Sequence, residues 1–171
     1  PLPPGAKAEL EDAGQRYQKG TTNVWSIISV DPQRNLVFVP TGNSSPDYYG
    51  GLRGGLDKGL DFYSSSVVAL DGDSGRVVWH FQAVHHDIWD YDIAPAPMLA
   101  TITREDGTQQ DVVVQTGKQG KFFVFDRDTG ESLFPIVEKP VPTDAAPGEV
   151  PYPTQPWPLK PDPLVRTSFY E

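Results

Sequence analysis

Val68-Ala69-Leu70-Asp71-Gly72-Asp73-Ser74-Gly75-Arg76-Val77-Val78-Trp79 decides the fold, because its pattern returns 55 residues later as Phe123-Val124-Phe125-Asp126-Arg127-Asp128-Thr129-Gly130-Glu131-Ser132-Leu133-Phe134. Both stretches hold an apolar residue, Asp, any residue, Asp, Ser or Thr, Gly, three variable residues and an aromatic. We expect a strand, a turn closed by the Asp and Ser or Thr side chains with Gly at positive φ, and a returning strand whose aromatic packs between sheets. Four short strands with their loops fill such a repeat, so the sequence predicts an all-β fold that is part of a β-propeller.

The rest of the chain alternates β-rich runs with turns, which predicts antiparallel hairpins. A third, degenerate copy of the repeat spans Ser29 to Leu36. The expected strand pairs are Val24–Val30 with Leu36–Pro40, Tyr63–Leu70 with Arg76–Gln82, Met98–Thr103 with Asp111–Gln115, and Phe122–Phe125 with Glu131–Val137. Long loops are expected at Thr41–Asp61 and Ala83–Pro97, and loops of that length are often functional.

Composition shifts divide the chain into three segments. Residues 1–20, with a weak helical pattern at 6–14, are expected to connect blades, and residues 21–137 to form blades that carry part of a site. From Glu138 prolines recur every few residues, so residues 138–171 are expected to be extended with little sheet pairing of their own. Whether this tail is a linker or an ordered excursion over the propeller face stays open.

Composition excludes several function classes. The 171 residues carry a formal net charge of -9, which argues against a nucleic-acid surface. The absence of cysteine excludes disulfides, zinc–thiolate sites and cysteine nucleophiles within the chain. No apolar run approaches the roughly 20 residues of a membrane span. The start at Pro1 shows neither an initiating Met nor a signal peptide, so we expect an internal piece of a longer protein.

Three loop motifs and one tryptophan carry candidate chemistry. The densest is Val84–Asp92, with two His, three Asp and two aromatics, whose carboxylates can ligate a hard cation or accept a proton. Its adjacent histidines point to opposite sides of an extended chain, so one metal held by both is not expected. Earlier in the chain Asn43 offers an amide oxygen, and after the motif a Thr-Gly-Lys-Gln-Gly run places Lys118 between glycines. Taken singly, the Val84–Asp92 motif fits function and turn hydrogen bonds equally well. An Asx turn for Asn43, a solvated side chain for Lys118 and core packing for Trp25 are each favoured over function.

Taken together, the motifs resemble the quinoprotein alcohol and sugar dehydrogenases, which use pyrroloquinoline quinone. The similarity runs from about Thr21 to Val137 and is closest to the membrane-bound glucose, quinate and polyol branch. It rests on ordered motifs: Asn23-Val24-Trp25, Pro40-Thr41-Gly42-Asn43, Pro46-Asp47, Tyr63-Ser64-Ser65-Ser66, Val84-His85-His86-Asp87-Ile88-Trp89-Asp90 and Pro153-Thr154-Gln155-Pro156. The resemblance implies an eight-bladed propeller, of which this chain covers a part.

The resemblance also implies roles for five residues. Asp90 matches the catalytic base, which also lies at the metal, and Asn43 matches a metal ligand. Trp25 matches the flat floor under the quinone, and Lys118 matches the basic residue that bonds the quinone oxygens. Thr22 is a further candidate to reach the cofactor.

The same resemblance implies cofactors, partners and a location. The implied cofactors are pyrroloquinoline quinone and Ca²⁺ or Mg²⁺. The implied partners are a small alcohol or sugar substrate and a ubiquinone or cytochrome electron acceptor. The implied location of the parent protein is the periplasm, and attachment of that protein to the inner membrane is left open.

The chemistry of these residue types agrees with the implied roles. A bound cation polarises a quinone carbonyl, and Lys118 adds positive charge where negative charge develops. Asp90 can remove the substrate hydroxyl proton as the adjacent hydride moves to the quinone, and an indole gives a planar cofactor a platform. Further quinone and metal ligands of the family are not recognisable here. We therefore expect the isolated chain neither to bind the quinone tightly nor to turn over.

Two other function classes stay open on the residues alone. A non-catalytic propeller scaffold needs the same Asp-Ser/Thr-Gly turns, and a calcium-dependent sugar-binding β module would use the Asp- and Tyr-rich loops. Asn43, Asp90 and Lys118 gathered around one tryptophan would favour the enzyme, because a scaffold does not need that gathering.

Overall fold

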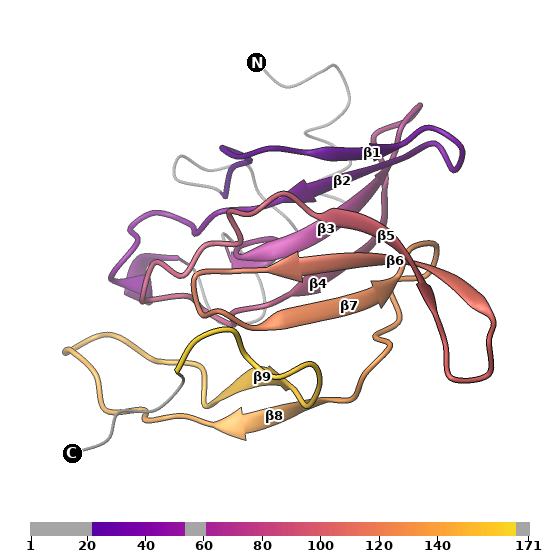
Figure 1. Ribbon diagram of the computed structural model, residues 1–171. Helices are drawn as coiled ribbons and strands as arrows, with labels where there is room; N and C mark the ends of the chain where they lie inside the picture. The colour runs from indigo at the N-terminus through magenta and orange to yellow at the C-terminus, as the bar shows by residue number, and fades with distance from the viewer. Residues whose placement is uncertain (1–21, 54–60, 167–171) are drawn as a thin grey trace.

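The computed structural model describes residues 22–53 and 61–166 of the chain (Figure 1). Within these ranges nine strands form three antiparallel sheets, and one short 3-10 turn, η1 (Gly50–Leu52), interrupts the loop after the second strand. The described residues include no helix of the length and apolar character that crossing a bilayer requires. The segment 1–20, with its expected helical turn, lies outside the described residues.

The first sheet has four strands in sequential order. These are β1 (Ser29–Asp31), β2 (Leu36–Pro40), β3 (Ser66–Asp71) and β4 (Val77–Gln82). Each neighbouring pair is antiparallel, as the hairpin patterns predicted. Four sequential antiparallel strands are the form of one propeller blade.

The second sheet repeats most of this plan, and a third sheet follows it. β5 (Met98–Thr103), β6 (Gln109–Thr116) and β7 (Phe122–Asp126) pair in sequential order. β8 (Ile136–Pro140) and β9 (Thr154–Pro158) then form a two-stranded sheet. The all-β prediction is therefore confirmed.

The repeated turns have the predicted construction. Asp71 Oδ1 accepts hydrogen bonds from the backbone N (2.8 Å) and hydroxyl (2.6 Å) of Ser74, and Gly75 follows at a φ of 70°. In the second copy, Asp126 Oδ1 accepts the equivalent two bonds from Thr129, and Gly130 has a φ of 73°. Both glycines occupy the left-handed region, which other residues enter at a cost.

The core lies between the first two sheets and is largely aromatic. Trp79 on β4 stands between Phe38 and Phe125, with ring centroids 5.8 Å from each. Phe81 packs 5.1 Å from Phe123 and 4.8 Å from Phe125, so both sheets contribute rings. The aromatic residue of the first repeat thus packs between sheets, as predicted, and its indole N–H donates to the carbonyl of residue 127 (3.2 Å) in the turn of the second repeat.

The first predicted strand is shorter than expected. Val24–Ile28 lies outside β1, and Trp25 is 57% exposed, so core packing and a strand position were both wrong for this residue. The five-residue β2 pairs with only three residues of β1. The segment before β1 contacts Gly42 rather than extending the sheet. The backbone N–H of Gly42 donates to the carbonyl of Asn23 (2.9 Å).

The last predicted hairpin was also partly wrong. Of the expected strand Glu131–Val137, only the first three residues, Glu131 to Leu133, bond back to β7. Pro135 follows without an N–H, which ends that ladder. The chain then enters β8 and pairs with β9, which corrects the expectation of a tail with little sheet pairing and favours the ordered alternative for residues 138–158.

Candidate functional site

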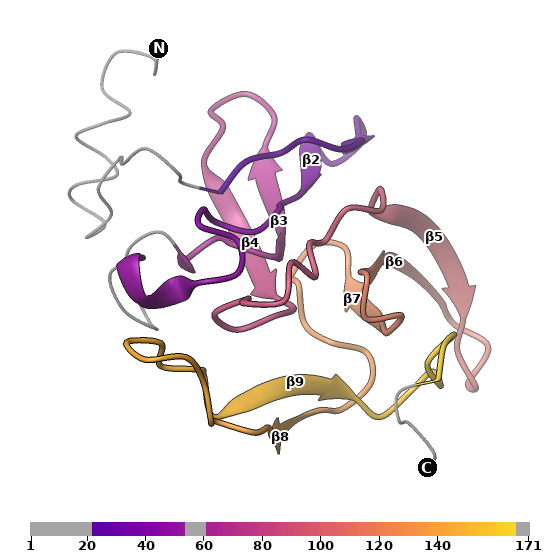
Figure 2. The same ribbon diagram turned by 90° about the vertical axis from the view of Figure 1, so that its left-hand side faces the viewer.

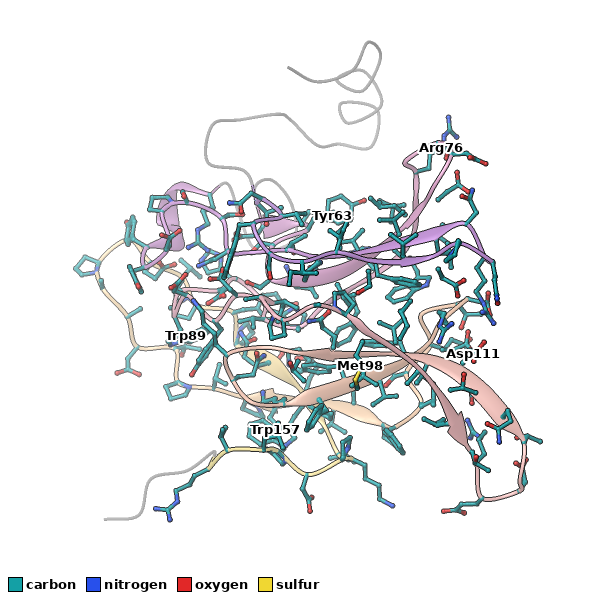
Figure 3. All side chains as sticks on the ribbon, turned by 45° about the horizontal axis from the view of Figure 1, so that its top comes forward. Tyr63, Arg76, Trp89, Met98, Asp111 and Trp157 are labelled. Carbon is teal, nitrogen blue, oxygen red and sulfur yellow. The ribbon has the colours of Figure 1, made fainter. Side chains whose placement is uncertain are left out.

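Three loops and the segment before β1 meet at one end of the sheets, the end that Figure 2 faces. β2, β4 and β6 all finish there, because alternate strands of an antiparallel sheet run in the same direction. The loop after β2 carries Asn43, the loop after β4 carries Asp90, and the loop after β6 carries Lys118. Figure 3 shows the side chains of this end around the labelled Trp89.

The segment before β1 is tied to Gly42. Thr22 donates its hydroxyl hydrogen to the Gly42 carbonyl (2.5 Å). The Trp25 indole packs so closely on Gly42 that an added Cβ would lie 2.6 Å from its Nε1 atom. Only glycine allows this approach. The indole therefore lies beside the Asn43 loop, with 57% of the residue exposed.

Asp92 joins the three loops, although the sequence analysis singled it out only as one of the three Asp in the Val84–Asp92 motif. Its Oδ1 accepts a hydrogen bond from the backbone N of Asn43 (2.6 Å), and its Oδ2 accepts one from Lys118 Nζ (2.8 Å). An added Cβ on Gly42 would also lie 3.1 Å from Asp92 Oδ1. The Asp-x-Asp spacing after Trp89 was the only signal in the sequence.

Lys118 and Asp90 form an ion pair at the open side of the site. Lys118 Nζ donates to Asp90 Oδ2 (3.1 Å) and to the Asp90 carbonyl (2.8 Å). The hydrogen bond to Asp92, together with the one to Asp90, raises the pKa of Lys118, so the ammonium stays charged at neutral pH. The Lys118 side chain is 43% exposed and that of Asp90 30%, so both are open to small molecules.

The Asn43 side chain bonds neighbouring parts of the loops through both of its polar atoms. Its Nδ2 donates to the carbonyls of Asp47 (2.9 Å) and Asp87 (2.8 Å), and its Oδ1 accepts from the backbone N of Ser44 (2.8 Å). These bonds are not those of an Asx turn, in which the side-chain oxygen accepts from the backbone N–H two residues on. The amide oxygen keeps a second lone pair, which the hydroxyl of Ser64 approaches at 3.5 Å.

Asp87 fixes the shape of the loop that carries Asp90. It is fully buried, and it accepts hydrogen bonds from the backbone N of Trp89 (3.0 Å), the backbone N of Tyr91 (2.9 Å) and the hydroxyl of Ser65 (2.7 Å). Burial raises the pKa of Asp87, although these hydrogen bonds act in the opposite direction. The bonds offset a strained backbone, since three non-glycine residues in this loop, Asp90 among them at 59°, have positive φ.

The two adjacent histidines point to different partners, as expected. His85 contacts Gln82 (2.7 Å) and Glu138 (3.2 Å) through its two ring nitrogens. His86 lies between Asp61 Oδ2 (2.6 Å) and Glu149 Oε1 (2.8 Å), and all three side chains are at most 3% exposed. Glu149 lies 63 residues beyond His86, so no local pattern could have paired them.

The residue types present fit the implied cofactors as part of a larger site. Carboxylate and amide oxygens from Asp90, Asp92 and Asn43 are ligands that hard cations prefer. Within residues 22–53 and 61–166, however, no three His, Asp or Glu side chains are grouped closely enough to hold a metal by themselves. The exposed indole of Trp25 suits one face of a planar cofactor. A complete site therefore needs groups beyond those described here.

Comparison with known proteins places the chain among quinoprotein dehydrogenases. It matches the family described as "PQQ: Glucose/ethanol/alcohol dehydrogenase, beta-propeller domain" over residues 1–170. It is 39% identical to the quinoprotein glucose dehydrogenase of Gluconobacter oxydans, over 85% of this chain and 18% of that protein. It is 41% identical to the quinate/shikimate dehydrogenase (quinone) of Acinetobacter baylyi, over 84% of this chain and 17% of that protein.

Solved structures agree on the fold. The quinohemoprotein alcohol dehydrogenase of Pseudomonas putida superposes with a TM-score of 0.62 and 32% identity, over 79% of this chain and 21% of that one. The quinohemoprotein alcohol dehydrogenase of Comamonas testosteroni gives a TM-score of 0.60 and 33% identity, over 82% and 20%. The chain thus spans about a fifth of the length of these proteins. The predictions of a partial β-propeller and of the quinoprotein resemblance are confirmed, and the chain belongs to the PQQ β-propeller family of glucose, ethanol and alcohol dehydrogenases.

Proposed function

We propose that the full-length protein containing this chain is a quinone-dependent dehydrogenase that oxidises an alcohol or sugar hydroxyl. The observation that carries the proposal is the gathering of Trp25, Asn43, Asp90 and Lys118 from four separate segments. Asp92 and Gly42 connect them through direct contacts. A propeller scaffold without chemistry has no need for this gathering, and family membership supports the same conclusion.

Asp90 is proposed as the base that accepts the substrate hydroxyl proton. When bound, pyrroloquinoline quinone supplies a hydride acceptor, and Ca²⁺ or Mg²⁺ supplies the positive charge that polarises it. Lys118 uses its three N–H groups on the Asp90 carbonyl and on the carboxylates of Asp90 and Asp92. Exchanging the 3.1 Å bond to Asp90 for a bond to a cofactor oxygen would free a carboxylate lone pair for the substrate.

The other candidate residues are proposed to hold the cofactors. Trp25 would form the floor under the quinone, because its indole is exposed on one side and fixed against Gly42 on the other. Thr22, bonded to the same glycine, would fix the edge of that floor. The oxygens of Asn43, Asp90 and Asp92 would supply part of the cation's ligands. Because this is a partial set, the isolated chain is expected neither to bind the quinone tightly nor to turn over.

Reconstitution of the full-length protein tests this proposal. Pyrroloquinoline quinone is added with Ca²⁺ or Mg²⁺, and dye reduction is followed with glucose, quinate, polyols and simple alcohols. Asp90→Asn should lower kcat by about 10²- to 10⁴-fold, because it removes the base while keeping the side-chain shape. Asp73→Asn, in the exposed β3–β4 turn at the opposite end of the sheet, is the matched control and should keep full activity.

The outcomes separate the competing classes. Activity that depends on quinone and is lost only in Asp90→Asn supports the dehydrogenase. Absence of quinone binding with either metal contradicts it and favours the scaffold, whereas sugar binding that needs calcium but no quinone favours a sugar-binding module. Dye reduction by the isolated chain would contradict the expected incompleteness of its site.

The electron acceptor and the location are proposed on the family resemblance alone. We place the full-length protein in the periplasm, with attachment to the inner membrane left as a further hypothesis, and with ubiquinone or a cytochrome as acceptor. Fractionation of cells that produce the protein, followed by activity measurements with each acceptor, tests both. Activity confined to the cytoplasmic fraction would contradict the location.

A further inference from the structure

A cavity of about 450 Å³ opens beside Lys118 and is lined by cations and aromatic rings. Its walls come from the Asp90 loop, the β6–β7 loop, the two strands β8 and β9, and the chain that follows them. Four of the lining side chains are basic, namely Lys118, Lys121, Lys139 and Arg166, and Trp89 and Trp157 are among the rings. The volume is in the range of small-molecule sites.

Two of these cations have no carboxylate in salt-bridge contact among the residues that the structure describes. Lys121 is only 7% exposed, yet within residues 22–53 and 61–166 its ammonium donates one hydrogen bond, to the carbonyl of Pro156 (3.2 Å). Its Nζ lies 4.1 Å from the centre of the Trp157 ring, and Lys139 Nζ lies 3.9 Å from the same ring. Among the described residues neither ammonium forms a salt bridge, although Lys118 in the same cavity forms two.

Glu138 acts on the Lys121 ammonium from a distance but forms no salt bridge with it. Glu138 precedes Lys139 on β8, but its carboxylate contacts His85 Nε2 at 3.2 Å. A buried ammonium without a counter-charge is costly, and a second ammonium nearby adds repulsion. The chain as a whole carries a net charge of -9, so these lysines are not part of a generally basic surface. An anion in the cavity would neutralise both and recover the cost.

The cavity adjoins the proposed catalytic site through Lys118. Lys118 lines it and also bonds Asp90 Oδ2, and the two residues on either side of Asp90 line it as well. Val84 and Trp157 give apolar contact for ring carbons, and Gln155 is a polar neighbour. We propose that this cavity binds the carboxylate of a small hydroxy acid, such as a sugar acid, through Lys121 and Lys139 while a hydroxyl of the same molecule reaches Asp90. The part played by Asp90 rests on the proposed dehydrogenase function.

Glucose and glucuronate form the matched pair of probes, because they share a ring and differ in one carboxylate. Binding of each to the full-length protein is measured by titration calorimetry. Glucuronate should bind at least about 10-fold more tightly than glucose, the effect of one charge-assisted contact. Lys121→Met and Lys139→Met should each weaken glucuronate binding and leave glucose binding unchanged. Lys160→Met, on the exposed tail outside the cavity, should change neither.

The outcomes distinguish this inference from the proposed function. Equal affinity for the two sugars overturns the carboxylate site, as does a preference for glucuronate that survives in the Lys121→Met/Lys139→Met double variant. Lysine-dependent binding of glucuronate supports the site even if no sugar reduces dye after reconstitution with quinone. In that case the carboxylate site stands and the dehydrogenase proposal fails.

Discussion

Lys121 is a charged residue whose surroundings work against its charge. Burial, and then the neighbouring Lys139 ammonium, lower the pKa of Lys121 from 10.5 to about 8, while Glu138 acts in the opposite direction. Residues kept at a cost to stability are common where binding requires them. The carboxylate site proposed for this cavity gives a reason for keeping this lysine.

Replacing the ammonium by an apolar chain of similar length should therefore stabilise the protein. Lys121→Met is expected to raise the free energy of unfolding at pH 7 by about 1 kcal/mol, because it removes an uncompensated buried charge. The sign of the pH effect follows from the lowered pKa. Between about pH 8 and 10.5 the unfolded chain binds more protons than the folded one, so the wild type gains stability as pH rises.

The measurement is the denaturation midpoint of both proteins at pH 7 and pH 10. The advantage of Lys121→Met should shrink at the higher pH. A variant that is less stable than wild type at pH 7 would show that the ammonium has a partner that stabilises it. Lys139→Met, with an exposed side chain, should have a smaller effect.

At the scale of elements, the two copies of the repeat differ at one informative position. Gly75 and Gly130 have nearly equal φ values of 70° and 73°. A Cβ on Gly75 would meet nothing within 4 Å, whereas a Cβ on Gly130 would lie 2.5 Å from the Trp79 ring. The aromatic residue of the first blade thus packs on the turn of the second.

Alanine at the two glycines should separate backbone strain from packing. Gly75→Ala should cost about 1 kcal/mol, the penalty of a left-handed residue. Gly130→Ala pays the same penalty and also displaces the indole, so its cost should be about 1–3 kcal/mol greater. Thermal midpoints of the two variants give the comparison. An equal decrease of the thermal midpoint in both variants would mean that the Trp79 ring can move away and that the two repeats do not pack tightly on each other.

The same scale shows where sequence reasoning succeeded. The Asp-Ser/Thr-Gly turns and the hairpins around them depend on residues near in sequence, and Met98–Thr103 was predicted to its ends. The pairing of β8 with β9 was missed, because prolines within and around both strands argue against a sheet. The prediction of a strand at Val24–Ile28 was wrong. These residues are of types common in strands, but the five-residue β2 is too short to pair with all of the predicted strand.

At the scale of the whole molecule, the site was predictable in its members but not in its connections. Five residues were named from motif order, and the structure brings all five to one end of the sheets. Asp92, which joins them, and Glu149, which reaches His86 from the tail, depend on contacts between distant segments. The roles of the five residues in catalysis stay predictions.

The contact of His86 with Asp61 and Glu149 fastens the tail to two loops. Burial opposes a charged imidazole, but the carboxylates of Asp61 and Glu149 outweigh it and raise the pKa of His86. Burial raises the pKa of Glu149, but hydrogen bonds to its charged form outweigh burial and lower it. The donors are His86 and the backbone N–H groups of Gly50 and Val150. The Arg53 guanidinium is a further charged group beside this cluster, with its Nη1 atom 3.4 Å from Asp61 Oδ1.

The tail should therefore be held most firmly in mildly acidic solution. The contribution of His86 is complete below its unfolded pKa of 6.5 and is lost as pH rises through the higher folded value. The contribution of Glu149 is present above 4.5 and is lost as pH falls through its lower folded value. Hydrogen exchange of residues 141–153, corrected for intrinsic rates, should be slower at pH 5.5 than at pH 8.5. Glu149→Gln should remove most of this difference while β5 and β6 stay unchanged, because the contact includes no residue of these two strands. An unaltered pH response in Glu149→Gln would mean that His86 does not hold the tail.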